Sequence, residues 1–516
     1  MDNSSSLSLV LSCLFSVIII IIWMLIFQTF HINTFPRTKR KNNPPGPKPL
    51  PIIGNLLELG NKPHKSLAKL SQSYGPVMCL KFGRITSIVI SSSALAKQVL
   101  QTHDQFFSHR TIPDAVRAHD HDRFGMAWIP VSTPRWRKLR RLCSHHLFSA
   151  RALDANQNLR QNKVRELLSD VEKSVEAGET VDIGRAAFRT SLNLLSTTFF
   201  SVDFAGSSSS DITREIKETV WRIMEEVGKP NVADYFPLLK WIDPQGIRRR
   251  TNVQTQKLVD LFDRVIDERL RVREVMKSGY TEDKDMLDTL INMTSDEDDR
   301  EDHFDRTKIQ HLLLDLFTAG TDTTSSTLEW SLAELLKAPE IMSKARAELE
   351  QVIGKGNQVN ESDITRLPYL QAIIKETLRL HPPTPLLLPR KAGADVEILE
   401  YIIPKGAQVL INVWATGRDP SIWDNPKKFR PERFIESSID VGGGHFELTP
   451  FGGGRRICPG LPLAMRMLHL MLGSLLHSFD WKLGDGVGPD DLNMEDKFGL
   501  TLQMAQPLLV IPMSTM

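Results

Sequence analysis

The chain has 516 residues, of which 41% are hydrophobic and 24% are charged, and its formal net charge is +2. This composition is that of a globular protein and excludes disorder over most of the length, while the near-neutral charge argues against a nucleic-acid partner. The four cysteines, at positions 13, 79, 143 and 458, are too few and too scattered for a disulfide framework, which suits a reducing compartment.

The first predicted element is a membrane-spanning helix. Residues 7–30 contain no charged side chain, and as a helix they would be roughly 36 Å long, enough to cross a ~30 Å hydrocarbon core. A cleaved signal peptide is the alternative, but it would carry its positive charge ahead of the apolar stretch, whereas here the basic cluster follows, over residues 37–41. The positive-inside rule then keeps this flank in the cytosol. We therefore expect a retained single-pass anchor over residues 1–30.

A basic, proline-rich segment over residues 31–50 is predicted to be a hinge, because proline removes backbone donors and favours extended conformations. Residues 51–516 are expected to form one large domain. Strand signals occur at residues 86–91 and 408–413, but helical signals are far more frequent. The predicted fold class is therefore mainly α with a minor β-sheet region.

The clearest helix is predicted over residues 308–338. Thr307 and Gln310 have the spacing of a capping box at its start, and Pro339 is expected to end it. Its middle, residues 319–324, concentrates poor helix formers, and glycine alone costs about 1 kcal/mol relative to alanine there. A weak point in the middle of a long helix favours a functional explanation.

The most informative segment is Phe-Gly-Gly-Gly-Arg-Arg-Ile-Cys-Pro-Gly at residues 451–460. Its glycines let the backbone approach something flat and bulky, and backbone N–H groups near Cys458 would stabilise a thiolate. Arg456 can pair with a carboxylate. A phosphate-binding loop is the alternative, but the Gly-Lys-Ser/Thr ending is missing; a lone cysteine is more often a buried apolar residue.

The order Phe-x-x-Gly-x-Arg-x-Cys-x-Gly matches the haem-binding signature of the cytochrome P-450 superfamily, which the chain resembles throughout its cytosolic length. The resemblance implies a P-450-type domain that holds haem b (iron protoporphyrin IX), with Cys458 as the metal ligand. It also implies further cofactor-binding residues: Trp136, Arg140, Arg390, Phe451, Gly454, Arg456 and Gly460.

Two further segments resemble the same family. Residues 319–324 are similar to its oxygen-activation segment, in which Asp322 and Thr323 would be catalytic and would relay protons; the alternative for Thr323 is a hydroxyl-to-carbonyl bond within its own helix. A second predicted helix, residues 370–380, carries a Glu-x-x-Arg pair that is most often a solvated surface pair. The resemblance instead implies a buried structural triad of Glu376, Arg379 and Arg433.

Several stretches resemble one plant group, the geraniol-hydroxylase-like terpenoid oxidases: residues 182–193, 243–248, 319–330 and 497–501. This resemblance implies a small lipophilic plant metabolite as the substrate, a geraniol-type monoterpenol first and a diterpene second. The pocket would include Ala319, Leu386, Leu387, Leu388 and Phe498. The His-Asp-His-Asp run at residues 119–122 is predicted to be an exposed polar loop rather than a metal site.

The chain shows no convincing dinucleotide or flavin motif, so its iron would need an external reductant. For members of microsomal type, the resemblance implies NADPH-cytochrome reductase as the partner, and a catalytic domain that faces the cytosol from the endoplasmic reticulum membrane. A haem-thiolate isomerase or dehydratase and a non-catalytic haem sensor are the alternatives. Neither requires the acid–threonine pair at Asp322 and Thr323.

Overall fold

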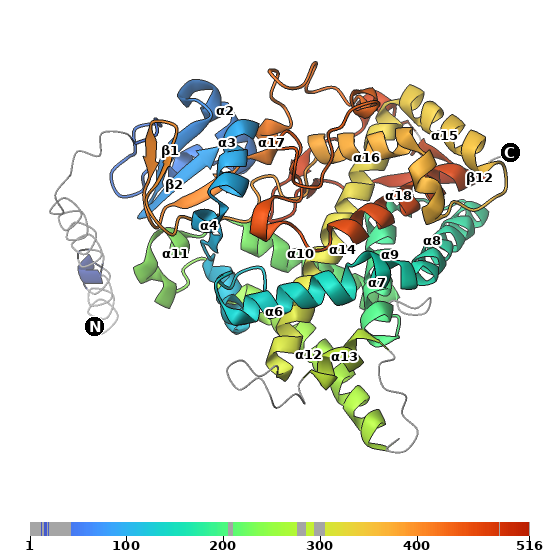
Figure 1. Ribbon diagram of the computed structural model, residues 1–516, viewed down its shortest axis with the longest axis horizontal. Helices are drawn as coiled ribbons and strands as arrows, with labels where there is room; N and C mark the ends of the chain where they lie inside the picture. Colours follow the sequence, from blue (N-terminus) through green and yellow to red (C-terminus); the bar gives the residue numbers. More distant parts are fainter. Residues whose placement is uncertain are drawn as a thin grey trace, which may run out of the picture.

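The computed structural model describes residues 43–204, 210–275, 285–293, 305–484 and 486–514, with isolated positions at 12, 15–17 and 19. These residues form a mainly helical domain with small sheets, so the predicted fold class is confirmed at that level (Figure 1). Within the described part of the chain, no helix has the length and apolar character needed to cross a bilayer. The anchor predicted for residues 1–30 lies almost entirely outside the described residues.

The helix α14 (Arg306–Lys337) runs through the middle of the domain and is buried along most of its length (Figure 1). It packs against α9 (Ile183–Phe200), α16 (Pro368–Leu380) and α18 (Leu461–Ser478). Because it contacts neighbours on several sides, most of its side chains are buried, and these include polar ones such as His311, Asp315 and Glu329.

The predicted capping box of α14 is wrong. The side chain of Asp305 accepts a hydrogen bond from the Lys308 N–H group and is the N-cap, so the helix begins two residues before the predicted start. Pro339 does not simply end α14 but is the first residue of α15 (Pro339–Ile353), a position where its missing N–H group costs nothing.

The main sheet has five strands in the order β1-β2-β8-β5-β3. The strands β2 and β8 are parallel, and the other pairs are antiparallel. Both predicted strands are confirmed to within two residues at each end, and Val413 instead begins a short helix. The bounds are β1 (Val77–Phe82), β2 (Ile85–Ile90), β3 (His109–Arg110), β5 (Arg390–Lys391) and β8 (Gln408–Ile411).

The short pairing of β3 with β5 matters for the site, because it joins two segments that are distant in sequence. Arg110 and Arg390 are direct partners in this ladder. Directly opposite residues on one face of an antiparallel pair lie close together. The sheet therefore places two cationic side chains next to each other.

Other helices surround this frame: α2 (Pro63–Tyr74), α3 (Ser93–Lys97), α4 (Asp104–Phe107), α5 (His121–Phe124), α6 (Pro134–Leu142), α7 (Ala150–Ala155), α8 (Gln157–Ala177), α10 (Ser210–Gly228), α11 (Val232–Tyr235), α12 (Ile247–Val275), α13 (Met286–Asn292) and α17 (Val413–Thr416). Short 3-10 turns are η3 (Asp114–Asp120) and η8 (Gly454–Arg456), which lie near the site, and η7 (Pro431–Phe434), which packs against α16. The smaller sheets contain β4 (Val181–Asp182), β6 (Val396–Ile398), β7 (Tyr401–Ile403), β9 (Phe479–Leu483), β10 (Asp496–Lys497), β11 (Gln503–Met504) and β12 (Leu509–Ser514).

Candidate active site

A cavity of about 360 Å³ lies inside the domain and is lined by residues of α6, α9, α14 and the loop that contains Cys458. Most of its wall is apolar, with side chains such as Leu194, Leu195, Met224 and Leu316. A largely hydrophobic cavity with a few polar groups is typical of a site for a small lipophilic molecule.

Cys458 lines this cavity directly after η8. Its N–H group donates to the Phe451 carbonyl oxygen at 3.0 Å, which fixes the loop. Burial raises the pKa of the Cys458 thiol, whereas the N–H groups of Gly460 and Leu461 and the charge of Arg140 act in the opposite direction. These donors stabilise negative charge on sulfur, so the site is built to hold a thiolate once a cation binds there.

The glycine-rich loop is shaped by a close backbone contact. Gly454 has a φ of +65°, and a Cβ atom at this position would lie 2.0 Å from the Leu100 carbonyl oxygen. Only glycine fits here. The turn brings the Arg455 N–H group to the Asp104 carboxylate at 3.0 Å, which ties the loop to α4.

Three guanidinium groups meet at the cavity: Arg390 and Arg456, which are buried and were predicted, and Arg110, which is partly buried and was not predicted. Burial and the mutual repulsion of the three charges lower the pKa of Arg110, and burial lowers the pKa values of Arg390 and Arg456 to about 10. Asp104 offsets part of the charge, since it pairs with Arg390 at 3.4 Å. Such a cluster is suited to an anionic ligand.

Arg110 carries no sequence signal of its own. It stands outside every motif, and its role depends on the β3–β5 ladder that aligns it with Arg390. Its guanidinium donates to the carbonyl oxygens of Leu388 at 2.7 Å and Ala127 at 3.2 Å. These bonds hold the side chain at the cavity wall.

Trp136 and Arg140, one turn apart on α6, both line the cavity. The Arg456 guanidinium carbon lies 5.4 Å from the centroid of the indole ring of Trp136, a cation–π contact. Arg140 donates to the Ile457 carbonyl oxygen at 2.7 Å, beside the cysteine. The helix α6 thus contributes side chains to the same cavity that Cys458 lines.

The residues present fit the haem that the sequence resemblance implies. Cys458 lines a cavity with apolar walls, and the cluster of Arg110, Arg390 and Arg456 would balance two carboxylates of a planar ligand. Burying three cations together is costly unless anions join them, so the cluster itself favours such a ligand.

The segment predicted to activate oxygen, residues 319–324, is divided between two sides of α14. Ala319, Gly320 and Thr323 line the cavity. The Thr323 hydroxyl donates to the Ala319 carbonyl oxygen at 2.6 Å, which is the intrahelical hydrogen bond considered above as the alternative role of this side chain. Asp322 is buried away from the cavity lining, and its carboxylate accepts a hydrogen bond from Gln503 beside Thr501. Burial raises the pKa of Asp322 to about 6, and these two neighbours limit the rise.

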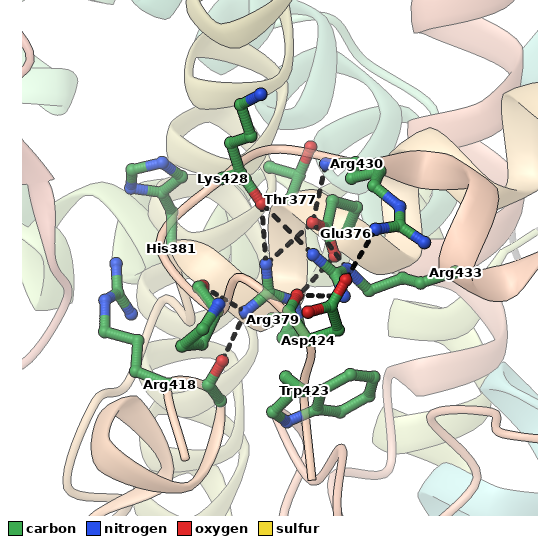
Figure 2. A network of polar contacts seen from close by, with 12 residues as sticks. Glu376, Thr377, Arg379, His381, Arg418, Trp423, Asp424, Lys428, Arg430 and Arg433 are labelled. Carbon is green, nitrogen blue, oxygen red and sulfur yellow. Dashed lines mark hydrogen bonds and ion pairs between the residues drawn. The ribbon is translucent and has the colours of Figure 1, made fainter. Parts of the chain in front are cut away.

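The structure brings Glu376, Arg379 and Arg433 together in a buried network (Figure 2). Arg379 donates to both oxygens of Glu376 at 2.6 and 2.7 Å, and Arg433 donates to one of them at 3.0 Å. Arg379 also donates to carbonyl oxygens of the 417–428 loop and lies over the Trp423 ring. The network therefore fastens α16 to the loop and η7, away from the cavity.

The predicted pocket residues lie in two places. Ala319, Leu387 and Leu388 line the cavity that contains Cys458. Leu386 and Phe498 line a second cavity of about 650 Å³, where Phe498 stacks on His64. Arg110, Val227, Thr384, Leu387 and Leu500 line both cavities.

The 119–122 run is not a uniformly exposed loop. The side chain of His121 is 17% exposed, and the residue lines the cavity beside Asp315. The expectation of an exposed polar loop is therefore wrong for His121, because the η3–α5 segment folds back onto α14. Among the described residues, no group of His, Cys, Asp and Glu has the arrangement of a metal site.

Comparison with known proteins gives one consistent result. The family profile described as Cytochrome P450 matches residues 44–509. The chain is 55% identical to a geraniol 8-hydroxylase of Swertia mussotii (93% of this chain and 95% of the relative) and 54% identical to one of Catharanthus roseus (95% and 98%). It is 51% identical to a drimenol monooxygenase of Persicaria hydropiper, with 93% of each chain covered.

Proposed function

The chain belongs to the cytochrome P450 family and is a monooxygenase, and we propose that it hydroxylates a small terpenoid alcohol, with geraniol as the first candidate and a diterpene as the second. The carrying observation is an apolar cavity that holds Cys458 and Thr323 in a chain similar over nearly its whole length to geraniol 8-hydroxylases. The drimenol monooxygenase is a third relative, and its name gives a second terpenoid alcohol as substrate.

Cys458 would hold the iron of haem b, and the bound group would supply dioxygen activation and oxygen insertion into a C–H bond. The protein's own residues hold and orient the reactants. Arg110, Arg390 and Arg456 would pair with the haem carboxylates, and the N–H groups beside Cys458 would stabilise its negative charge. The apolar wall would exclude water and orient the hydrocarbon part of the substrate.

Thr323 would hold a proton at its Oγ1 atom on the cavity wall, with Ala319 fixing the hydroxyl until it is needed. Asp322 would resupply that proton from inside the domain. Burial raises the pKa of its carboxyl group to about 6, so roughly a tenth of the molecules carry this proton at pH 7.

Electrons would come from NADPH-cytochrome reductase, because the sequence has no nucleotide-binding or flavin motif. The uncharged stretch before residue 31 and the basic residues after it support a single-pass anchor in the endoplasmic reticulum membrane, with the catalytic domain in the cytosol.

The test uses the full chain, loaded with haem and mixed with NADPH-cytochrome reductase, geraniol, NADPH and dioxygen. We expect a hydroxylated terpenol in proportion to NADPH consumed. The control is Cys458→His, which should lose both the product and the absorbance of a thiolate-bound reduced carbon-monoxide complex. Turnover of a substrate without NADPH would instead indicate an isomerase or dehydratase, and haem binding without turnover of any terpenoid would indicate a sensor.

A further inference from the structure

A cluster of His121, His311 and Asp315 lies where α5 meets α14, and neither the haem contacts nor the proton relay uses it. The Nδ1 atoms of His121 and His311 are 2.8 Å apart, and His121 Nε2 lies 3.1 Å from Asp315 Oδ1. Phe124 stacks on the His311 ring at 5.0 Å between centroids. The three polar side chains form one chain of hydrogen bonds that ends on a carboxylate.

The backbone around α5 positions this cluster. His119 and Asp120 have φ values of 51° and 56°, which turn the chain sharply between η3 and α5. His119 is also fixed from outside, since its N–H group is 3.2 Å from the Asn252 side-chain oxygen on α12. The turn directs His121 toward α14.

The cluster faces the cavity. Among the described residues that line it, Asp315 is the sole carboxylate and His121 the sole imidazole. The hydroxyl groups of Thr318, Thr323 and Thr324 on α14 also line the cavity, and each donates to a carbonyl oxygen of its own helix. These hydroxyl oxygens are neutral, so they are weaker hydrogen-bond acceptors for a ligand than the Asp315 carboxylate. A carboxylate accepts a stronger hydrogen bond than a neutral oxygen does.

Asp315 has acceptor capacity to spare. Its two oxygens are contacted by His121 Nε2 and, at 3.4 Å, by the Ala127 N–H group, whereas an ionised carboxylate has about four acceptor positions. Its side chain remains 10% exposed. Burial, with the nearby His121, lowers the pKa of His311 to about 3, so His311 is neutral and its Nδ1–H can donate to His121 while His121 donates to Asp315.

The spacing along α14 relates this acceptor to the site of reaction. Asp315, Ala319 and Thr323 follow one another at intervals of four residues and all line the cavity. Asp315 therefore lies two turns from Thr323, ~12 Å along the helix axis. A molecule whose hydroxyl group is bound at Asp315 presents its other end near Thr323.

We propose that Asp315, oriented by His121, is a specificity-determining residue that accepts a hydrogen bond from the hydroxyl group of a terpenoid alcohol and directs oxidation to the end of the molecule remote from that hydroxyl. This inference rests on the proposed function and adds to it the mode of substrate recognition. The hydrocarbon remainder of the substrate lies against the apolar wall.

The test compares two ligands that share a carbon skeleton: geraniol, which can donate a hydrogen bond, and geranyl methyl ether, which cannot. Dissociation constants are measured on the haem-loaded full chain by calorimetry and by the substrate-induced change in haem absorbance. The wild-type protein should bind geraniol about tenfold to a hundredfold more tightly than the ether, the range for a hydrogen bond to a charged group.

Asp315→Asn should lower the affinity for geraniol to nearly that for the ether and leave the ether unchanged, and its product should no longer be confined to the remote end. His121→Gln should cause a smaller loss of the same kind. The matched control is Thr318→Val, on the same helix and in the same cavity wall, which should alter the two affinities alike. Haem content and the thermal unfolding midpoint show which variants are folded.

The outcomes separate the two proposals. If the wild-type protein binds neither ligand and hydroxylates no terpenoid, the proposed function is wrong. If it hydroxylates geraniol but binds the two ligands equally, or if Asp315→Asn weakens both to the same degree, the hydroxyl anchor is wrong and the function stands. If the Asp315 variant fails to fold, the wild-type comparison still tests for a hydroxyl acceptor, and His121→Gln tests whether that acceptor belongs to this cluster.

Discussion

Thr323 occupies the point where α14 meets the cavity that contains Cys458. Its hydroxyl donates a hydrogen bond to the Ala319 carbonyl oxygen, the bond expected of any threonine within a helix. A catalytic role requires that the Thr323 hydroxyl oxygen also contact the reacting molecules, and its position in the cavity wall permits this contact. Asp322, the neighbour in sequence, faces the interior beside Gln503 instead.

We expect Thr323→Ala to uncouple NADPH consumption from hydroxylation, because the proton proposed to reside on the Thr323 hydroxyl would no longer be held at the cavity wall. General acid–base groups contribute about 100-fold or more, although water can replace the hydroxyl in part. The measurement is hydroxylated product per NADPH consumed, with released hydrogen peroxide counted alongside. Thr323→Ser keeps the hydroxyl and is the control. If Thr323→Ala keeps the wild-type ratio of product to NADPH consumed, the Thr323 hydroxyl has no role beyond its hydrogen bond within α14.

The buried network of α16 and η7 is a feature of elements rather than of single residues. Glu376 and Arg379 lie on one face of α16, and Arg433 belongs to η7. The three charged groups are therefore buried between α16, η7 and the 417–428 loop (Figure 2). Removing one member leaves an uncompensated buried charge, which is far more costly than losing a surface pair.

Glu376→Gln should destabilise the domain by about 3–5 kcal/mol and reduce haem retention, because Arg379 would lose its carboxylate partner. The control is Lys344→Ala, which breaks the exposed pair with Glu432 on the same η7 and should cost less than ~1 kcal/mol. Thermal unfolding and haem content per chain measure both. Equal effects in the two variants would contradict a special role for the buried network.

A second element-scale feature is the contact of α14 with the C-terminal segment. Glu329 is buried there and accepts a hydrogen bond from the Leu508 N–H group at 2.9 Å. Burial raises the pKa of Glu329 from 4.5 to about 7. Because the folded state holds this proton more tightly than the unfolded state, the contribution is fully present below about pH 4.5 and is lost as the pH rises through 7.

Glu329→Gln keeps the acceptor but never ionises. Relative to wild type it should therefore gain stability as the pH rises from 5.5 to 8, by at most about 3 kcal/mol at the upper end. Unfolding midpoints of both proteins across this range test the prediction. A constant difference between them would mean that Glu329 does not titrate in the folded protein.

At the scale of the whole molecule, the described residues that build the core of the domain lie downstream of the predicted anchor. The core clusters and the cavity lining are formed by residues from Leu59 onward. The proposed anchor over residues 1–30 and the haem domain should therefore be separable, with the segment proposed as a hinge, residues 31–50, between them.

We expect a chain that lacks residues 1–30 to bind membranes more weakly while it still binds haem through Cys458. Sedimentation with microsomal vesicles and the reduced carbon-monoxide spectrum measure the two properties separately. A shortened chain that binds membranes as tightly as the full one would place the attachment elsewhere. One that never takes up haem would show that the two parts depend on each other.

The sequence by itself determined the fold class, the long central helix and the loop around Cys458, because these depend on local patterns: apolar periodicity, glycine spacing and a fixed order of functional side chains. The capping box at Thr307 was wrong since several residues there can cap a helix, and the backbone selected Asp305. The triad of Glu376, Arg379 and Arg433 could also be predicted from the sequence, because the resemblance to the family assigns all three residues to it.

Only the tertiary structure decided which residues share the cavity. Arg110 joins Arg390 through a two-residue ladder with no pattern of its own, and His121 reaches Asp315 because the chain turns sharply after η3. Leu386 and Phe498 face a second cavity instead of the first. Contacts between segments hundreds of positions apart depend on how whole elements pack, and the local sequence around each residue does not encode that packing.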